Sequence, residues 1–130
     1  MQPENETGRG RILIVDDDRS QRELLRETVQ KAGYRADTAE DGTSALELAA
    51  HDRYDFALLD FQMPGLNGIE LFTTLHQSQP WLRAVIITAY GSLRTVYPAI
   101  SAGVARVLPK PVDVAELLNV MADEINPQDE

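Results

Sequence analysis

The sequence predicts an α/β fold in which a doubly wound, five-stranded parallel sheet carries helices on both faces. Short apolar runs alternate five times with segments of helical periodicity. The runs are apolar at consecutive positions, which is typical of parallel strands covered on both faces. Capping or turn residues bound several helical segments, so strands and helices follow one another closely, as in a doubly wound sheet.

The first third of the chain contains two strand–helix units. The run RILIV at 11–15 is the first strand candidate. Residues 20–32 place apolar side chains on one helical face and stop at Gly33. The segment YRADTA at 34–39 is a weaker strand candidate, and DGTSALELAAH at 41–51 predicts a short helix capped by its aspartate.

The middle of the chain contains the most apolar strands. DFALLD at 55–60 is apolar at its four central positions, and RAVIIT at 83–88 is the most β-branched candidate, so both are expected to be buried strands. Between them, Asn67 followed by Glu70 resembles a capping box, in which two side chains and two backbone N–H groups satisfy one another. This pair predicts a helix over residues 69–77.

The last third continues the alternation. A helix is expected near residues 92–102, and ARVLP at 105–109 is the fifth strand candidate. Asp113 followed by Glu116 predicts the start of a final helix. Its apolar stripe consists of Val114, Leu117, Leu118, Met121 and Ile125.

Composition fits one soluble domain. The chain has 130 residues, of which 43% are hydrophobic. We expect a disordered leader at 1–10, a domain at 11–126 and a polar tail at 127–130. The net charge of −9 argues against direct nucleic-acid binding and against anionic membranes. Without cysteine, a signal-peptide pattern or a membrane-length apolar run, the cytoplasm is the expected location.

Polar side chains follow four of the predicted strands. They are Asp16, Asp17 and Asp18 after the first strand, Asp60 after the third, Thr88 after the fourth and Lys110 after the fifth. The carboxyl ends of parallel strands meet at one rim, where such sheets bind ligands. Like charges about 4 Å apart repel by roughly 4 kcal/mol at an effective dielectric near 20. The aspartates therefore indicate a cation site, and oxygen ligands suit Mg²⁺.

The same set of groups fits phosphoryl transfer. A carboxylate can act as a nucleophile and form an aspartyl phosphate. The phosphoryl oxygens then need neutralisation, which a divalent cation, a lysine and a hydroxyl can provide. One of the two lysines in the chain, Lys110, lies at this rim.

With their neighbours, these residues resemble the receiver domain of two-component response regulators. The matching segments are ILIVDD (12–17), LLDFQMPGLNGIEL (58–71), IITAYGS (86–92) and LPKP (108–111). Each segment is weak alone, but all four lie in order at strand ends. TAYGS with LPKP is most similar to receivers of the nitrogen-regulation class. The resemblance covers about residues 10–126 and implies the flavodoxin-like strand order 2-1-3-4-5.

The resemblance implies the roles of the acidic residues. Asp60 would be the phosphoacceptor. Asp16, Asp17 and Asp60 would hold Mg²⁺ together with the backbone carbonyl of Gln62. Asp18 belongs to the following loop, where family members vary, and is not expected to be a ligand.

The resemblance also implies roles on the other strands. Thr88 and Lys110 would contact the phosphoryl group, and the Lys110–Pro111 peptide bond would be cis. Gln62 and Tyr90 occupy positions at which the family tunes the loss of phosphate.

The implied function is signalling. The domain would take a phosphoryl group from a sensor histidine kinase or a phosphotransfer protein. It would catalyse only its own phosphorylation and slow dephosphorylation, and so is not an enzyme in the usual sense. Phosphorylation would switch partner binding, or homodimer formation, through the face of the fourth helix, fifth strand and fifth helix. The sequence does not identify the kinase or the downstream partner.

Two departures from the family pattern fall on that face. Receivers usually carry an aromatic residue three positions before the lysine, but this position is Val107. Pro98 lies within the segment expected to form the fourth helix, where it costs about 3 kcal/mol. The helix is therefore expected either to kink or to begin late, with Pro98 in its first turn.

Three other functions fit less well. A small-molecule phosphohydrolase would need its nucleophile after the first strand and a cap insertion. A flavin carrier would need a hydroxyl-rich phosphate loop where the aspartates lie. A receiver that acts unphosphorylated, as an interaction module, is disfavoured by the complete site but favoured by Val107.

Overall fold

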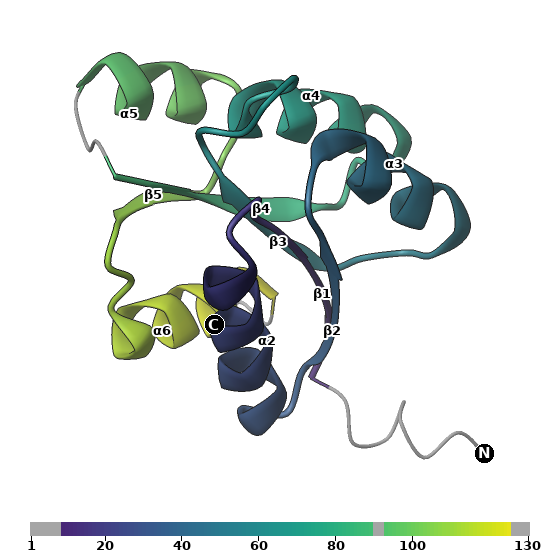
Figure 1. Ribbon diagram of the computed structural model, residues 1–130, viewed down its shortest axis with the longest axis vertical. Helices are drawn as coiled ribbons and strands as arrows, with labels where there is room; N and C mark the ends of the chain where they lie inside the picture. The colour runs from purple at the N-terminus through teal and green to yellow at the C-terminus, as the bar shows by residue number, and fades with distance from the viewer. Residues whose placement is uncertain (1–8, 90–92, 126–130) are drawn as a thin grey trace, which may run out of the picture.

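The computed structural model describes residues 9–89 and 93–125, and Figure 1 shows its ribbon. The elements in chain order are β1 (Arg11–Val15), α2 (Arg19–Lys31), β2 (Arg35–Ala39), α3 (Gly42–His51), β3 (Phe56–Asp60), α4 (Gly68–Ser78), β4 (Arg83–Thr88), α5 (Leu93–Ser101), β5 (Arg106–Pro109) and α6 (Val114–Ile125). The predicted alternation is confirmed, and the bounds of each element differ from the prediction by no more than one residue.

The five strands form one parallel sheet in the order β2-β1-β3-β4-β5, as the resemblance implied. The chain runs from β1 outward to β2, then returns to β3 and continues in the opposite direction. The strand order therefore reverses between β1 and β3. Such a reversal opens a crevice at the carboxyl ends of the two strands, where doubly wound sheets bind ligands.

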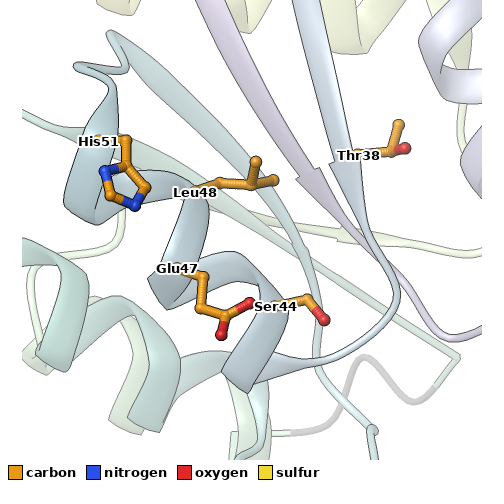
Figure 2. A pocket seen from close by; sticks show the side chains of 5 residues that line it. All are labelled: Thr38, Ser44, Glu47, Leu48 and His51. Atoms are coloured by element: carbon orange, nitrogen blue, oxygen red, sulfur yellow. The ribbon is translucent and has the colours of Figure 1, made fainter.

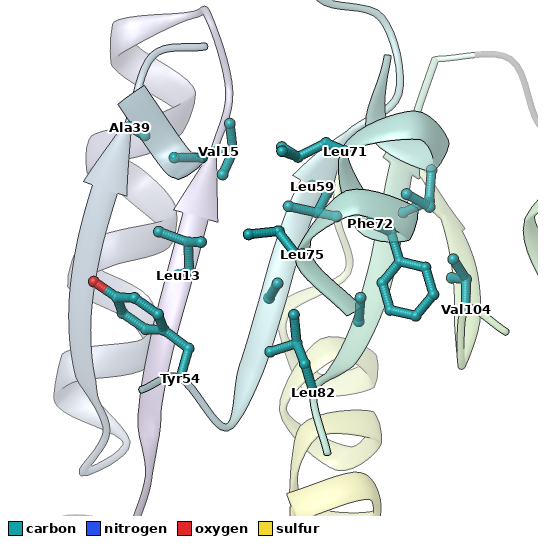
Figure 3. Packing of buried hydrophobic residues seen from close by; sticks show 14 of the residues in the cluster. Leu13, Val15, Ala39, Tyr54, Leu59, Leu71, Phe72, Leu75, Leu82 and Val104 are labelled. Atoms are coloured by element: carbon teal, nitrogen blue, oxygen red, sulfur yellow. The ribbon is translucent and has the colours of Figure 1, made fainter. Parts of the chain in front are cut away.

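Helices cover both faces of the sheet. α2 and α6 lie on one face, and α3, α4 and α5 lie on the other (Figure 1). Alternate side chains of β1 enter different cores, since successive residues of a strand point to opposite faces. Ile12 and Ile14 join the cluster of α2 and α6, whereas Leu13 and Val15 join the cluster of α3 and α4 (Figure 3).

The helices begin close to the strand ends because side chains cap their first turns. The Asp18 carboxylate accepts a hydrogen bond from the Gln21 N–H of α2, and Asp41 caps α3 in the same way. Asn67 and Glu70 form the predicted capping box of α4. These caps hold the loops at the carboxyl ends of the strands in short, defined paths.

Pro98 lies inside α5, which begins at Leu93 and ends at Ser101. The helix therefore does not begin late, and the alternative that placed Pro98 in the first turn is wrong. Because proline has no N–H, the carbonyl of Arg94 loses its helical partner, but the Pro98 carbonyl accepts from the Ala102 N–H at 3.0 Å.

Two residues of the predicted leader are part of the described fold. The Arg9 N–H donates to the Gly33 carbonyl at 3.0 Å, and the Gly10 carbonyl accepts from the Arg35 N–H at 2.9 Å. The rest of the predicted leader, at 1–8, and the tail lie outside the described residues. Among residues 9–89 and 93–125, every helix is too short or too polar to cross a bilayer.

Candidate functional site

The carboxyl ends of β1, β3, β4 and β5 bring the predicted site residues together. Asp16 follows β1 directly, Asp60 is the last residue of β3, and Thr88 is the last residue of β4. Lys110 follows β5, and its N–H donates to the Thr88 carbonyl at 2.9 Å. Parallel pairing places these ends at one rim, so the convergence expected from the sequence is present.

Three carboxylates form a cluster at this rim. Asp16, Asp17 and Asp60 each offer an oxygen, and these oxygens lie within 4.8 Å of one another. Asp16 is 1% exposed and Asp60 4% exposed, whereas Asp17 is exposed. Burial at the strand ends prevents two of the three charges from separating into solvent.

Lys110 is the cation closest to these carboxylates among the described residues. Its Nζ lies 3.2 Å from Asp60 Oδ1 and 3.7 Å from Asp16 Oδ2. Burial opposes the lysine charge, but the two carboxylates outweigh it and raise the pKa of Lys110. Lys110 is therefore cationic at neutral pH and partly balances the cluster.

The pKa values of the two buried aspartates, Asp16 and Asp60, are both raised. Burial, reinforced by the nearby Asp16 charge, raises the pKa of Asp60 to about 6, although Lys110 opposes the change. Burial also raises the pKa of Asp16. Burial therefore opposes the ionised form of both carboxylates.

The residues fit a hard divalent cation. The buried Asp16 Oδ2 accepts no hydrogen bond, whereas Asp16 Oδ1 accepts one from the Asp18 N–H at 2.9 Å. An oxygen that is buried and without a hydrogen bond is costly unless another positive group contacts it. Oxygen-only donors with room for water are the set that Mg²⁺ prefers.

The other predicted site residues differ in how far the structure describes them. The Asp18 carboxylate caps α2, and the carboxylate cluster consists of Asp16, Asp17 and Asp60. Gln62 is exposed in the loop two residues beyond Asp60, and Thr88 is 1% exposed. The Lys110–Pro111 bond is cis, as the resemblance implied. Tyr90 lies outside the described residues.

Sequence reasoning missed two residues that hold the rim in place. The Arg22 Nη1 donates to the Asp16 carbonyl at 2.8 Å. At Gly68, a Cβ would lie 2.7 Å from the Asp60 carbonyl oxygen, so only glycine leaves room for the close approach of α4 to β3. The spacing of six residues between Asp16 and Arg22 indicates this hydrogen bond only when the start of α2 is known.

Hollows elsewhere on the surface do not include the acidic cluster. One, of about 570 Å³, lies beside α3 and is lined by Thr38, Ser44, Glu47, Leu48 and His51 (Figure 2). A second, of about 420 Å³, lies where α3 and α4 end, near Trp81. Neither of these two hollows contains a residue of the rim.

Comparison with known proteins agrees with this geometry. The family model described as the response regulator receiver domain matches residues 12–122. The chain belongs to the response-regulator receiver domain family. The receiver is 42% identical over 108 residues to the response regulator MprA of Mycolicibacterium vanbaalenii, a match covering 83% of this chain and 47% of that protein. The chain thus spans about half the length of this relative.

Solved receiver structures share the fold. The CheY-like receiver domain protein of Methanospirillum hungatei superposes with a TM-score of 0.84 at 28% identity, over 89% of this chain and 93% of that chain. A Burkholderia pseudomallei response regulator, solved with a phosphorylated aspartic acid, a calcium ion and citrate, has a TM-score of 0.81 at 26% identity, over 88% and 68%. NtrX of Brucella abortus has a TM-score of 0.83 at 28% identity, over 89% and 27%, in keeping with the expected likeness to nitrogen-regulation receivers.

Proposed function

We propose that Asp60 accepts a phosphoryl group and that this modification controls binding to a partner. The observation that carries the proposal is the position of the Asp60 carboxylate. It is 4% exposed at the end of β3, lies 3.2 Å from the Lys110 ammonium and shares a rim with two further carboxylates. A carboxylate in this setting is oriented, nucleophilic and next to groups that can balance a phosphate.

The proposed step is a displacement at phosphorus. An Asp60 oxygen forms a bond to phosphorus while the bond between phosphorus and the donor nitrogen of a phosphohistidine breaks. The imidazole leaves with the electron pair and takes up a proton. Slow hydrolysis reverses the modification, since water attacks phosphorus and releases inorganic phosphate and the free carboxylate. The domain catalyses only these changes to itself.

Asp16, Asp17 and Asp60 are the proposed Mg²⁺ ligands, together with the main-chain carbonyl of Gln62. When bound, the ion neutralises phosphoryl oxygens as charge develops on them. Lys110 balances a further oxygen as a compact cation. We propose that Thr88, which is buried at the end of β4, donates its hydroxyl to the phosphoryl group once Asp60 is modified. That contact exists only in the modified state, which is what a switch requires.

The proposed output surface is the face formed by α5, β5 and α6. Tyr97 is 72% exposed, Ile100 48% and Val114 42%, so apolar side chains are available to a partner or a second copy. Val107 is half-buried against the core of α3, α4 and α5 and has no ring to move. We therefore propose that backbone or helix shifts, rather than rotation of an aromatic side chain, transmit the signal.

The proposed donor is a sensor histidine kinase or a phosphotransfer protein, in the cytoplasm. An acidic chain with net charge −9 is not expected to bind nucleic acid directly. The downstream effector and any phosphorylation-dependent dimer belong to the same proposal.

Acetyl phosphate with Mg²⁺ provides the test. Intact-mass spectrometry of the wild-type chain should show one added phosphoryl group, and EDTA should abolish it. Asp60→Asn should show none, whereas Asp18→Asn should be modified normally, because asparagine also caps a helix.

An adduct that persists in Asp60→Asn would identify another nucleophile. A wild-type chain that binds Mg²⁺ but is never modified would instead favour an interaction module that works without phosphate. Turnover of a generic phosphate ester would revive the phosphohydrolase alternative.

A further inference from the structure

The acidic rim is attached to α2 by a hydrogen bond from an arginine. Arg22 lies in the first half of α2, and its Nη1 donates to the Asp16 carbonyl oxygen at 2.8 Å. The side chain is partly buried, and its own N–H continues the helix by donating to the Asp18 carbonyl at 3.0 Å. A charged donor and a short distance make this one of the stronger hydrogen bonds at the rim.

The position of the accepting carbonyl gives this bond its significance. The Asp16 carbonyl belongs to the peptide group that joins Asp16 to Asp17. The Cα atoms that carry the two carboxylate side chains lie at the two ends of this peptide group, whose oxygen accepts the hydrogen bond from Arg22. The other side of Asp16 is held through its N–H, which donates to the Ala39 carbonyl at 3.2 Å. Without Arg22, this peptide plane could rotate and change the separation of the two carboxylates.

Local contacts already hold one Asp16 oxygen and leave the other available. Oδ1 accepts from the Asp18 N–H at 2.9 Å, while Oδ2 accepts no hydrogen bond and lies 3.7 Å from Lys110 Nζ. The Arg22 bond therefore completes a set of three contacts around Asp16 that fixes where Oδ2 is directed. Positioning of this kind lowers the cost of assembling a metal site.

We propose that Arg22 is a positioning residue for the Mg²⁺ site, acting through the Asp16–Asp17 peptide group rather than through its charge alone. The inference rests on the proposed function, in which Asp16 and Asp17 are metal ligands. It adds a residue from α2 to a site whose ligands all lie at strand ends. It also makes the metal affinity of the rim depend on the position of α2 relative to the end of β1.

Calorimetric titration of the whole chain with MgCl₂ tests the proposal. Arg22→Met keeps an apolar stem but removes the donor and should weaken Mg²⁺ binding by roughly tenfold. Arg22→Lys restores a cationic donor and should recover to within about threefold of wild type. Arg19→Met removes the same charge from an exposed position one turn earlier and should leave the affinity within about twofold.

Thermal unfolding in EDTA separates positioning from general destabilisation. The proposal requires that Arg22→Met lose affinity at a temperature where circular dichroism shows it folded. If Arg22→Met does not fold, Arg22→Gln against Arg19→Gln carries the test, because glutamine is polar but too short to keep the contact with the Asp16 carbonyl, and only the change at Arg22 should weaken Mg²⁺ binding.

Three results would overturn the inference. Wild-type affinity in folded Arg22→Met would show that the bond does not matter for the metal. Equal losses in Arg22→Met and Arg19→Met would show that only charge matters. A wild-type chain that binds no Mg²⁺ would refute the metal site itself. That result differs from a failure of the Arg22 inference, in which the wild type binds Mg²⁺ and only the comparison of variants fails.

Discussion

At the scale of single residues, the neighbouring aspartates Asp17 and Asp18 make different contacts. Asp17 offers an oxygen to the cluster, whereas the Asp18 carboxylate accepts from the Gln21 N–H at 3.1 Å. The run of three aspartates is thus divided between the carboxylate cluster and a helix cap. Sequence reasoning separated Asp18 from the other two only through the resemblance, because composition treats the three alike.

This division predicts opposite results for two matched substitutions. Asp17→Asn should weaken Mg²⁺ binding by at least tenfold, because an amide oxygen lacks the carboxylate charge. Asp18→Asn should leave the affinity within about threefold and stability within about 0.5 kcal/mol, because asparagine caps as well as aspartate. Calorimetric titration and urea unfolding measure both. Equal effects from the two substitutions would refute the assignment.

The raised pKa of Asp60, about 6 against an ordinary value near 3.8, predicts a pH dependence in EDTA. The folded state binds the proton more tightly than the unfolded state, so stability falls as pH rises from about 4 to about 6. The shift corresponds to at most about 3 kcal/mol. Asp60→Asn should therefore gain stability relative to wild type across this window.

Urea unfolding in EDTA at pH 4.5 and pH 7 measures the difference between wild type and Asp60→Asn. Saturating Mg²⁺ should remove the advantage of the variant at pH 7, since the ion compensates the charge that burial penalises. A difference that is the same at both pH values would contradict the proposed cause.

At the scale of elements, the first residue of α4 is limited by the strand beneath it. A Cβ at Gly68 would lie 2.7 Å from the Asp60 main-chain oxygen. Because this oxygen belongs to the backbone of β3, the clash can be relieved only if the strand or the helix shifts. At Gly42, the first residue of α3, a Cβ would lie 3.0 Å from Leu66 Cδ1 and 3.2 Å from Leu66 Cβ, which are atoms of a loop side chain and not of the sheet backbone. The two helices therefore tolerate a methyl group differently.

Gly68→Ala should destabilise the chain by about 1–3 kcal/mol and slow phosphorylation of Asp60. Gly42→Ala should cost less than about 1 kcal/mol, because better helix propensity offsets the displacement of Leu66. Urea unfolding and the rate of adduct formation from acetyl phosphate test the pair. Destabilisation of the two variants to the same extent would show that the Asp60 carbonyl is not the limiting contact.

Pro98 gives a second element-scale prediction. It lies within α5, is exposed and leaves one helical carbonyl without its usual partner. Pro98→Ala should therefore stabilise the chain, by up to about 3 kcal/mol. Chemical denaturation measures this gain. A loss of stability would mean that the ring contributes packing that the helical penalty conceals.

These elements also show what can be read from the chain. Apolar runs located four of the strands, and the Asn67–Glu70 pair located the start of α4, because both signals are local. The strand β2, with the sequence RADTA, gave the weaker signal. The sequence did not decide whether the helix continues through Pro98 or begins late, because proline occurs both in the first turn of helices and, with a broken hydrogen bond, inside them. Arg22 and Gly68 were missed because their importance comes from atoms on other elements.

At the scale of the whole molecule, the strand order predicted by resemblance brings the candidate residues to one rim. The convergence of Asp16, Asp60, Thr88 and Lys110 follows from parallel pairing, and so was predictable once the strands were located. The distances were not predictable: the 3.2 Å between Lys110 and Asp60 depends on the path of the chain after β5.

The central position of β3 has a consequence for how the domain responds. All five of its residues are buried, and it pairs with β1 and β4 on its two sides. Its amide protons should exchange with solvent only when the whole domain unfolds, unlike those of β5 at the sheet edge. Asp60 is therefore anchored to the part of the molecule that opens last. Any local opening caused by its modification must therefore occur in the surrounding loops and helices, while β3 itself stays paired with its neighbours.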